Sequence, residues 1–158
     1  MKQIKKFSYV LVMLVIVALT VGCGNKNIEG SLEDIMTKVY ADIPENERPM
    51  MLMNTEVNDE NIEYYLGTKD IEYEEALASE SGIGSIAHSV VLVRIKENAD
   101  VAEIKEKIKE NVNPRKWICV GVEEDDVIVE NKGDLIILIM VENENNREKI
   151  DNNFKSLK

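Results

Sequence analysis

Seven consecutive apolar residues, Leu135 to Val141, constrain the fold of this chain more than any other stretch. A second stretch, Ile86 to Ile95, is rich in β-branched residues and does not alternate between apolar and polar at 89–93. A strand with one face in solvent alternates, whereas a strand buried on both faces does not. We therefore expect two central strands in a sheet covered on both faces. The N-terminal helix and the methionine segment 49–53 are candidates for the second cover, and a partner subunit is the alternative.

Four other segments show the apolar spacing of helices. They are expected at 31–40, at 58–66, from Asp100 to about residue 112, and through Ile150, Phe154 and Leu157. Ser31 and Asp100 can cap the first and third of these helices, and Asn58 or Asp59 the second. Gly67 can end the second helix in a left-handed conformation.

Three further segments are expected to be strands. Residues 71–79 are ambiguous, because their propensities favour a helix while the turn at 81–85 favours a hairpin strand, which we prefer. Residues 116–122 and 127–130 have strand patterns, and Gly133 suits the hairpin turn that follows. The sequence therefore predicts a single two-layer α+β domain, with a mostly antiparallel sheet of four or five strands and helices packed on it.

The N-terminus has the parts of a secretory signal peptide. Residues 1–6 contain three lysines, residues 7–22 contain no charge, and Cys23 follows Gly22. This pattern is typical of a bacterial lipobox, in which Cys23 receives a diacylglyceryl group and becomes the first mature residue. Thr20 departs from the pattern, because leucine is usual there. The alternatives are an uncleaved membrane anchor and ordinary cleavage after a small residue.

This interpretation divides the chain into a signal peptide at 1–22, a lipidated Cys23 with a polar tether at 23–30, and one domain at 31–158. Lipid at Cys23 would anchor the protein to the outer face of the bacterial cytoplasmic membrane. The chain has two cysteines, so a lipidated Cys23 leaves Cys119 without a disulfide partner. The domain must then depend on its hydrophobic core.

The charge of the expected mature chain is strongly negative. Removing residues 1–22 takes away three lysines and no acidic residue, which leaves 16 basic against 30 acidic residues and changes the net charge from −11 to −14. Such a chain repels nucleic acid and anionic headgroups. Cationic ligands and basic protein surfaces remain possible partners, although solubility is the simpler explanation.

Three segments carry a resemblance to a known family. They are 87–93 (AHSVVLV), 113–120 (NPRKWICV) and 127–135 (VIVENKGDL). Over roughly residues 31–157, the chain resembles a family of small bacterial lipoproteins that is described only as a domain of unknown function. The resemblance implies an α+β fold and a location at the cell envelope, and it implies no chemistry.

His88 and Cys119 are the residues that a thiol enzyme would use as base and nucleophile. A reactive thiolate needs an electropositive, partly exposed site. Trp117, Ile118 and Val120 instead surround Cys119 with apolar side chains. We therefore expect a packed core cysteine rather than a catalytic pair.

Two charged segments are candidate ligand sites. Glu123 to Asp126 could bind calcium, but the segment lacks the alternating ligands and glycine of an EF-hand loop, so a solvated turn is preferred. Arg115 and Lys116 beside Trp117 could contact an anionic ligand, although basic residues after a helix more often complement its dipole. One histidine and one free cysteine are too few for zinc, and no phosphate-binding glycine loop or hydrolase motif occurs. We expect no metal or other cofactor.

These patterns favour a non-enzymatic binding module at the cell envelope, with an envelope protein or a cationic ligand as its partner. An envelope thiol enzyme that uses Cys119 and His88 is one alternative. A structural homodimer joined through the second sheet face is another.

Overall fold

The computed structural model describes residues 27–158, and these form an α+β domain around one antiparallel sheet. Its helices are α2 (Leu32–Val39), α3 (Ile62–Leu66), α4 (Val101–Asn111) and α5 (Glu144–Ser156), with two 3-10 turns at Glu45–Glu47 and Glu124–Asp126. Its strands are β1 (Leu52–Val57), β2 (Tyr73–Ser81), β3 (His88–Ile95), β4 (Ile128–Lys132) and β5 (Leu135–Val141). The predicted fold class is confirmed.

The five strands lie in the order β1-β2-β3-β5-β4, and every neighbouring pair is antiparallel. The two long apolar stretches are β3 and β5, which pair at the centre from His88 opposite Val141 to Arg94 opposite Leu135. The preference for a strand at 71–79 is confirmed by β2. The edges are β1 on one side and β4 on the other.

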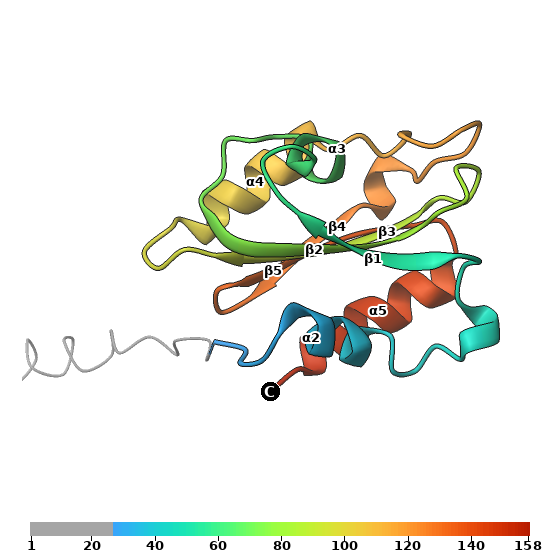
Figure 1. Cartoon of the computed structure of the whole chain (residues 1–158), viewed down its shortest axis with the longest axis horizontal. Helices are drawn as coiled ribbons and strands as arrows, with labels where there is room; N and C mark the ends of the chain where they lie inside the picture. The colour runs from blue at the N-terminus through green and yellow to red at the C-terminus, as the bar shows by residue number, and fades with distance from the viewer. Residues whose placement is uncertain (1–26) are drawn as a thin grey trace, which may run out of the picture.

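Helices cover both faces of the sheet, so the domain has three layers rather than the two expected. Figure 1 shows α3 and α4 on one side of the strands and α2 and α5 on the other. Alternate residues of β5 supply the two cores: Ile136, Leu138 and Met140 face α3 and α4, and the others face α2 and α5. A third layer forms because both sides of the central strands are apolar.

The methionine segment does not cover a sheet face, which corrects that expectation. Met50, Met51 and Met53 are all exposed, and residues 52–57 form the edge strand β1 instead. The short helix α3 and helix α4 take the covering position.

Local sequence signals explain most helix boundaries. Ser31 Oγ accepts a hydrogen bond from the Asp34 amide, and the Asp100 side chain accepts from the amides of residues 102 and 103. Gly67 ends α3 with a φ of 75°, as expected. The second helix begins later than predicted, at Ile62, because Asn58 uses its side chain in a turn with the Glu60 amide.

The predicted strand at 116–122 is wrong, because these residues form a compact loop. The Val122 amide donates to the Pro114 carbonyl, which closes the loop on itself, and Cys119 has a φ of 61° that breaks an extended backbone. The segment is apolar because Trp117 and Val122 reach into the core, while Ile118 is exposed.

The folded chain includes the end of the expected tether. Ile28 is only 2% exposed and packs in the core beneath α2 and α5. The Arg94 guanidinium donates to the carbonyls of Ile28 and Gly30 at 2.7 and 2.9 Å. The chain is therefore held against the end of β3 from Ile28 onward. No helix among residues 27–158 has the length and apolar character needed to cross a bilayer.

Candidate functional site

His88 is a buried hydrogen-bonding residue on the α2/α5 face of the sheet. Its Nε2 lies 2.7 Å from the Tyr40 hydroxyl, and burial lowers the pKa of His88 to about 4. Burial also raises the pKa of Tyr40, so both groups are neutral near pH 7. The tautomer of the imidazole sets which of the two groups donates in this hydrogen bond. This pair joins α2 to β3 and leaves His88 unsuited to act as a base for a solvent-exposed nucleophile.

Cys119 is exposed, which corrects the expectation of a core cysteine. It lies in the 114–122 loop, which packs through Trp117 and Val122 against the α3/α4 core. His88 points to the opposite face of the sheet, toward Tyr40. The structure therefore does not bring Cys119 and His88 together as a catalytic pair.

The acidic turn at 123–126 does not gather its carboxylates around a common point. Glu123 accepts from Arg115 at 2.8 Å, and Asp126 accepts from Arg147 at 2.8 Å. Within residues 27–158, no group of three or more His, Cys, Asp or Glu side chains is arranged to hold a metal ion. The turn joins the 114–122 loop to α5 through these two ion pairs.

Lys116 is buried, and it connects the 114–122 loop to β2 and α3. Its side chain is 4% exposed, and its Nζ lies 3.1 Å from Glu80 Oε1. The same nitrogen lies 4.2, 4.9 and 5.2 Å from the ring centres of Tyr64, Tyr65 and Trp117. Burial lowers the pKa of Lys116, and the neighbouring Glu80 carboxylate opposes that shift.

The basic and aromatic cluster predicted at 115–117 is therefore divided in the fold. Arg115 is exposed and paired with Glu123, Lys116 is buried and paired with Glu80, and the Trp117 ring packs in the core. Because each base has a carboxylate partner, the cluster does not present free charge to an anionic ligand. Cys23, the predicted lipid attachment residue, lies outside the described residues.

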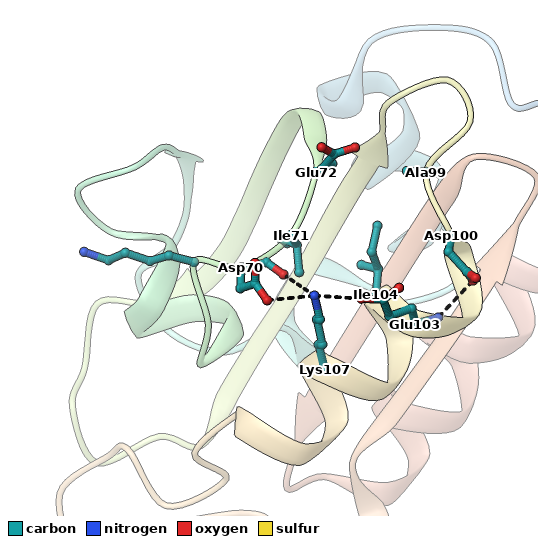
Figure 2. A pocket seen from close by; sticks show the side chains of 9 residues that line it. Asp70, Ile71, Glu72, Ala99, Asp100, Glu103, Ile104 and Lys107 are labelled. Atoms are coloured by element: carbon teal, nitrogen blue, oxygen red, sulfur yellow. Dashed lines mark hydrogen bonds and ion pairs between the residues drawn. The ribbon is translucent and has the colours of Figure 1, made fainter.

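A hollow between the start of β2 and α4 is lined mainly by charged side chains, three of which form ion pairs with one another. Figure 2 shows Lys107 between Asp70 and Glu103, with its Nζ 2.8 Å from Asp70 Oδ2 and 2.9 Å from Glu103 Oε1. These hydrogen bonds raise the pKa of Lys107. The ion pair between Lys107 and Asp70 connects α4 to the loop before β2.

The exposed large apolar side chains of the described chain gather at one end of the sheet. We call this set the methionine patch; its members, which are between 52% and 69% exposed, are Met50, Met51, Met53, Tyr64 and Ile118. A side chain at Gly82 would meet Met53 Cε at 3.0 Å, and one at Gly84 would meet Ile118 Cδ1 at 3.2 Å. Both contacts lie on the turn after β2, so the patch is continuous around that turn.

The buried Lys116 ammonium packs against the ring of Tyr64, a member of this patch. Tyr64 donates to Glu80 at 3.3 Å, and Glu80 is the register partner of Met53. Burial and the adjacent Glu80 raise the pKa of Tyr64 to about 12, which keeps its hydroxyl a donor. The Glu80 carboxylate therefore holds Tyr64 and Lys116 in place beside Met53.

A second surface feature lies at the other end of β1. We call it the acidic hollow; the acidic side chains that line it are Glu56, Asp59, Glu60, Glu74 and Glu75. Within residues 27–158, Glu75 is the one member with a salt bridge, to Arg94 at 2.8 Å. Tyr73 donates to Asp59 at 3.2 Å and forms part of the wall. Edge strand β1 thus runs from an apolar end to an acidic end.

Comparison of the chain with protein-family models, curated proteins and solved structures finds no match. The resemblance to a lipoprotein family stays a prediction.

Sequence reasoning ranked the methionine segment as core filling above an adaptable binding surface, and the structure shows it exposed at β1. The run Met50-Met51-Leu52-Met53 is plain in the sequence. A methionine run has the same composition whether its side chains are exposed or fill a core, so the sequence does not show that these three methionines are exposed. β1 also lacks the alternation of apolar and polar residues that marks a half-buried strand, because an edge strand that is largely exposed needs no apolar face. Only the position of β1 at the sheet edge distinguishes the two interpretations.

Proposed function

We propose that this protein is a lipid-anchored binding module at the outer face of the bacterial cytoplasmic membrane, and that it holds a partner protein at the methionine patch. The basic head, the uncharged run and Cys23 support the anchor. An exposed methionine-rich surface supports the binding role, because flexible thioether side chains adapt to a partner and large exposed apolar patches mark interaction sites.

The observation that carries this proposal is the position of the patch relative to the anchor. Four residues, 24–27, separate Cys23 from the packed Ile28, so the lipid would lie within five chain steps, about 18 Å, of the Arg94 end of β3. The patch surrounds the turn before the other end of β3, about 20 Å along the strand. Figure 1 shows these two ends on opposite sides of the domain. The patch would then face away from the membrane.

The test is site-specific photo-crosslinking in intact bacteria that express the full-length chain. A photoreactive residue at Met51 is expected to give one discrete protein adduct. The same residue at Glu106, on the exposed surface of α4, is the matched control and is expected to give none. Replacement of Cys23 by serine should move the protein from the membrane fraction to the soluble fraction and weaken the adduct.

Two results would contradict the proposal. Equal adduct yields at positions 51 and 106 would remove the binding surface. A Cys23→Ser protein that stays in the membrane fraction, with an unmodified Met1 found by mass spectrometry, would remove the lipid anchor.

A further inference from the structure

We infer that β1 accepts an extended segment of the partner protein as a sixth, antiparallel strand, with apolar side chains of that segment on the methionine patch and its Lys or Arg residues in the acidic hollow. This inference rests on the proposed binding function and specifies the chemistry of the partner. It rests on three features of β1. These are the backbone groups that face away from the sheet, the different chemistry of the two ends, and a sequence without the lysine or proline that often protects an edge strand.

The backbone of β1 has hydrogen-bonding groups that face away from the sheet. The Gly82 amide donates to the Met51 carbonyl at 2.9 Å, so Met51 belongs to the set of residues that bond β2. In an antiparallel ladder these residues alternate with residues whose N–H and C=O point outward. The outward set is therefore Leu52, Asn54 and Glu56. The Asn61 side chain donates to the Glu56 carbonyl at 3.0 Å, which agrees with that assignment, so a bound strand would use the outward groups of Leu52 and Asn54.

The two ends of β1 differ in chemistry. The methionine patch lies at the Leu52 end and the acidic hollow at the Val57 end, about 17 Å apart for five strand steps. A bound strand that satisfies both ends carries apolar residues at one end and basic residues at the other. Since every strand pair in the sheet is antiparallel, the basic residues belong in the N-terminal half of the segment.

The same polarity disfavours a second copy of this chain as the occupant. An antiparallel β1–β1 pair about a two-fold axis places the Leu52 end of each copy beside the Val57 end of the other. Each methionine patch would then face an acidic hollow. The strong negative charge of the chain adds repulsion between copies. A basic and apolar segment of another protein fits both ends, and a second copy fits neither.

The two edges of the sheet are not equally open. Natural edge strands are often protected by lysine, proline, bulges or a covering element. The residues of β4 are all half-buried, Lys105 of α4 pairs with Glu130, and Lys132 donates to the carbonyls of Lys155 and Leu157. In β1, residues 53–56 are all exposed, and its sequence, LMNTEV, has no lysine and no proline. β1 is therefore the edge suited to strand addition.

The test measures binding of a fluorescent peptide to the full-length protein in detergent micelles. The probe carries lysines in its N-terminal half and leucine and valine in its C-terminal half, and the control peptide has the same composition in the reverse order. We expect the probe to bind at least about tenfold more tightly than the control. Asn54→Pro removes an outward N–H without touching the bonds to β2, and should weaken the probe at least about tenfold.

Asn54→Ala is the matched variant, because it keeps the N–H and should leave affinity within about twofold. Thermal unfolding of both variants shows whether they fold. Equal binding of the two peptides to the wild-type protein overturns the inference and does not depend on any variant. Unchanged probe affinity in a folded Asn54→Pro protein also overturns it.

These outcomes separate the inference from the proposed function. A photo-adduct at position 51 that survives Asn54→Pro keeps the binding module and rejects strand addition. Concentration-dependent dimers in sedimentation that Asn54→Pro abolishes would reject the partner segment in favour of a second copy.

Discussion

His88 illustrates how burial turns a titratable residue into a structural one. His88 is 3% exposed, and its Nε2 forms a hydrogen bond of 2.7 Å with the Tyr40 hydroxyl. Protonating His88 would place a cation in an apolar layer, which is costly. The single histidine of the chain thus acts as a connection between α2 and β3.

This environment makes stability depend on pH. The pKa of His88 is lowered by burial to about 4, below the value of about 6.5 in the unfolded chain, so the unfolded state binds the proton first as pH falls. Stability is expected to fall by roughly 3 kcal/mol between about pH 6.5 and pH 4 from this group. Urea unfolding of the wild-type protein and His88→Gln across this range should show a shallower pH dependence in the variant.

Tyr40→Phe is the control for that comparison. It removes the hydrogen bond but leaves the imidazole buried, so the pH dependence due to His88 should remain. Parallel pH profiles of the wild-type protein and His88→Gln would show that other groups control acid stability.

Lys116, in contrast to His88, is a charged side chain that is buried together with its partner Glu80. A basic residue after a helix is expected to complement the helix dipole, yet the Lys116 ammonium lies among three aromatic rings and beside Glu80. Burying one charge is costly without its partner. The pair therefore holds the 114–122 loop against β2 rather than offering charge to a ligand.

At the scale of elements, Gly67 is the point where α3 and α4 meet. Its φ is 75°, and a Cβ there would lie 2.1 Å from the Asn111 carbonyl oxygen at the end of α4. Glycine is therefore required twice, for the left-handed turn and for the close approach of two backbones.

Gly67→Ala is expected to lower the free energy of unfolding by at least about 3 kcal/mol, because strain near 1 kcal/mol is joined by a backbone collision. Gly30→Ala is the matched control, since Gly30 also has a positive φ, 112°, but nothing lies within 4 Å of its Cβ position. Its cost should be about 1 kcal/mol. Denaturant unfolding measures both, and equal losses would mean that the Asn111 contact relaxes freely.

At the scale of the whole molecule, β3 and β5 couple the two cores. Alternate residues along each strand face opposite layers, so neither layer can separate without disrupting the strands that the other needs. Trp117 belongs to the α3/α4 core, and His88 faces the α2/α5 side beside Tyr40. The chain has one tryptophan and one histidine, so each layer contains its own unique probe.

We expect thermal unfolding followed by Trp117 fluorescence and by the His88 ring signals in NMR to give the same midpoint, because the cores share their central strands. A Trp117 transition several degrees below that of His88 would show that the α3/α4 layer opens separately.

Local sequence patterns predicted much of the fold. Unbroken apolar runs placed β3 and β5 at the centre, Ser31 and Asp100 marked two helix starts, and Gly67 marked a helix end. These signals depend on near neighbours in the chain and on the period of a strand or helix, so they are readable without knowing the fold. The loop at 114–122 misled the same reasoning, because its apolar residues serve a core contact rather than a strand face.

The sequence by itself determined an α+β domain with central strands buried on both faces, because β5 has no polar side. Only the tertiary structure decided which helices form the two covering layers, that Lys116 is buried and that Cys119 is exposed. It also decided that β1 is an open edge with an apolar end and an acidic end. Those properties depend on strand order and on contacts between residues far apart in the chain, which no local pattern encodes.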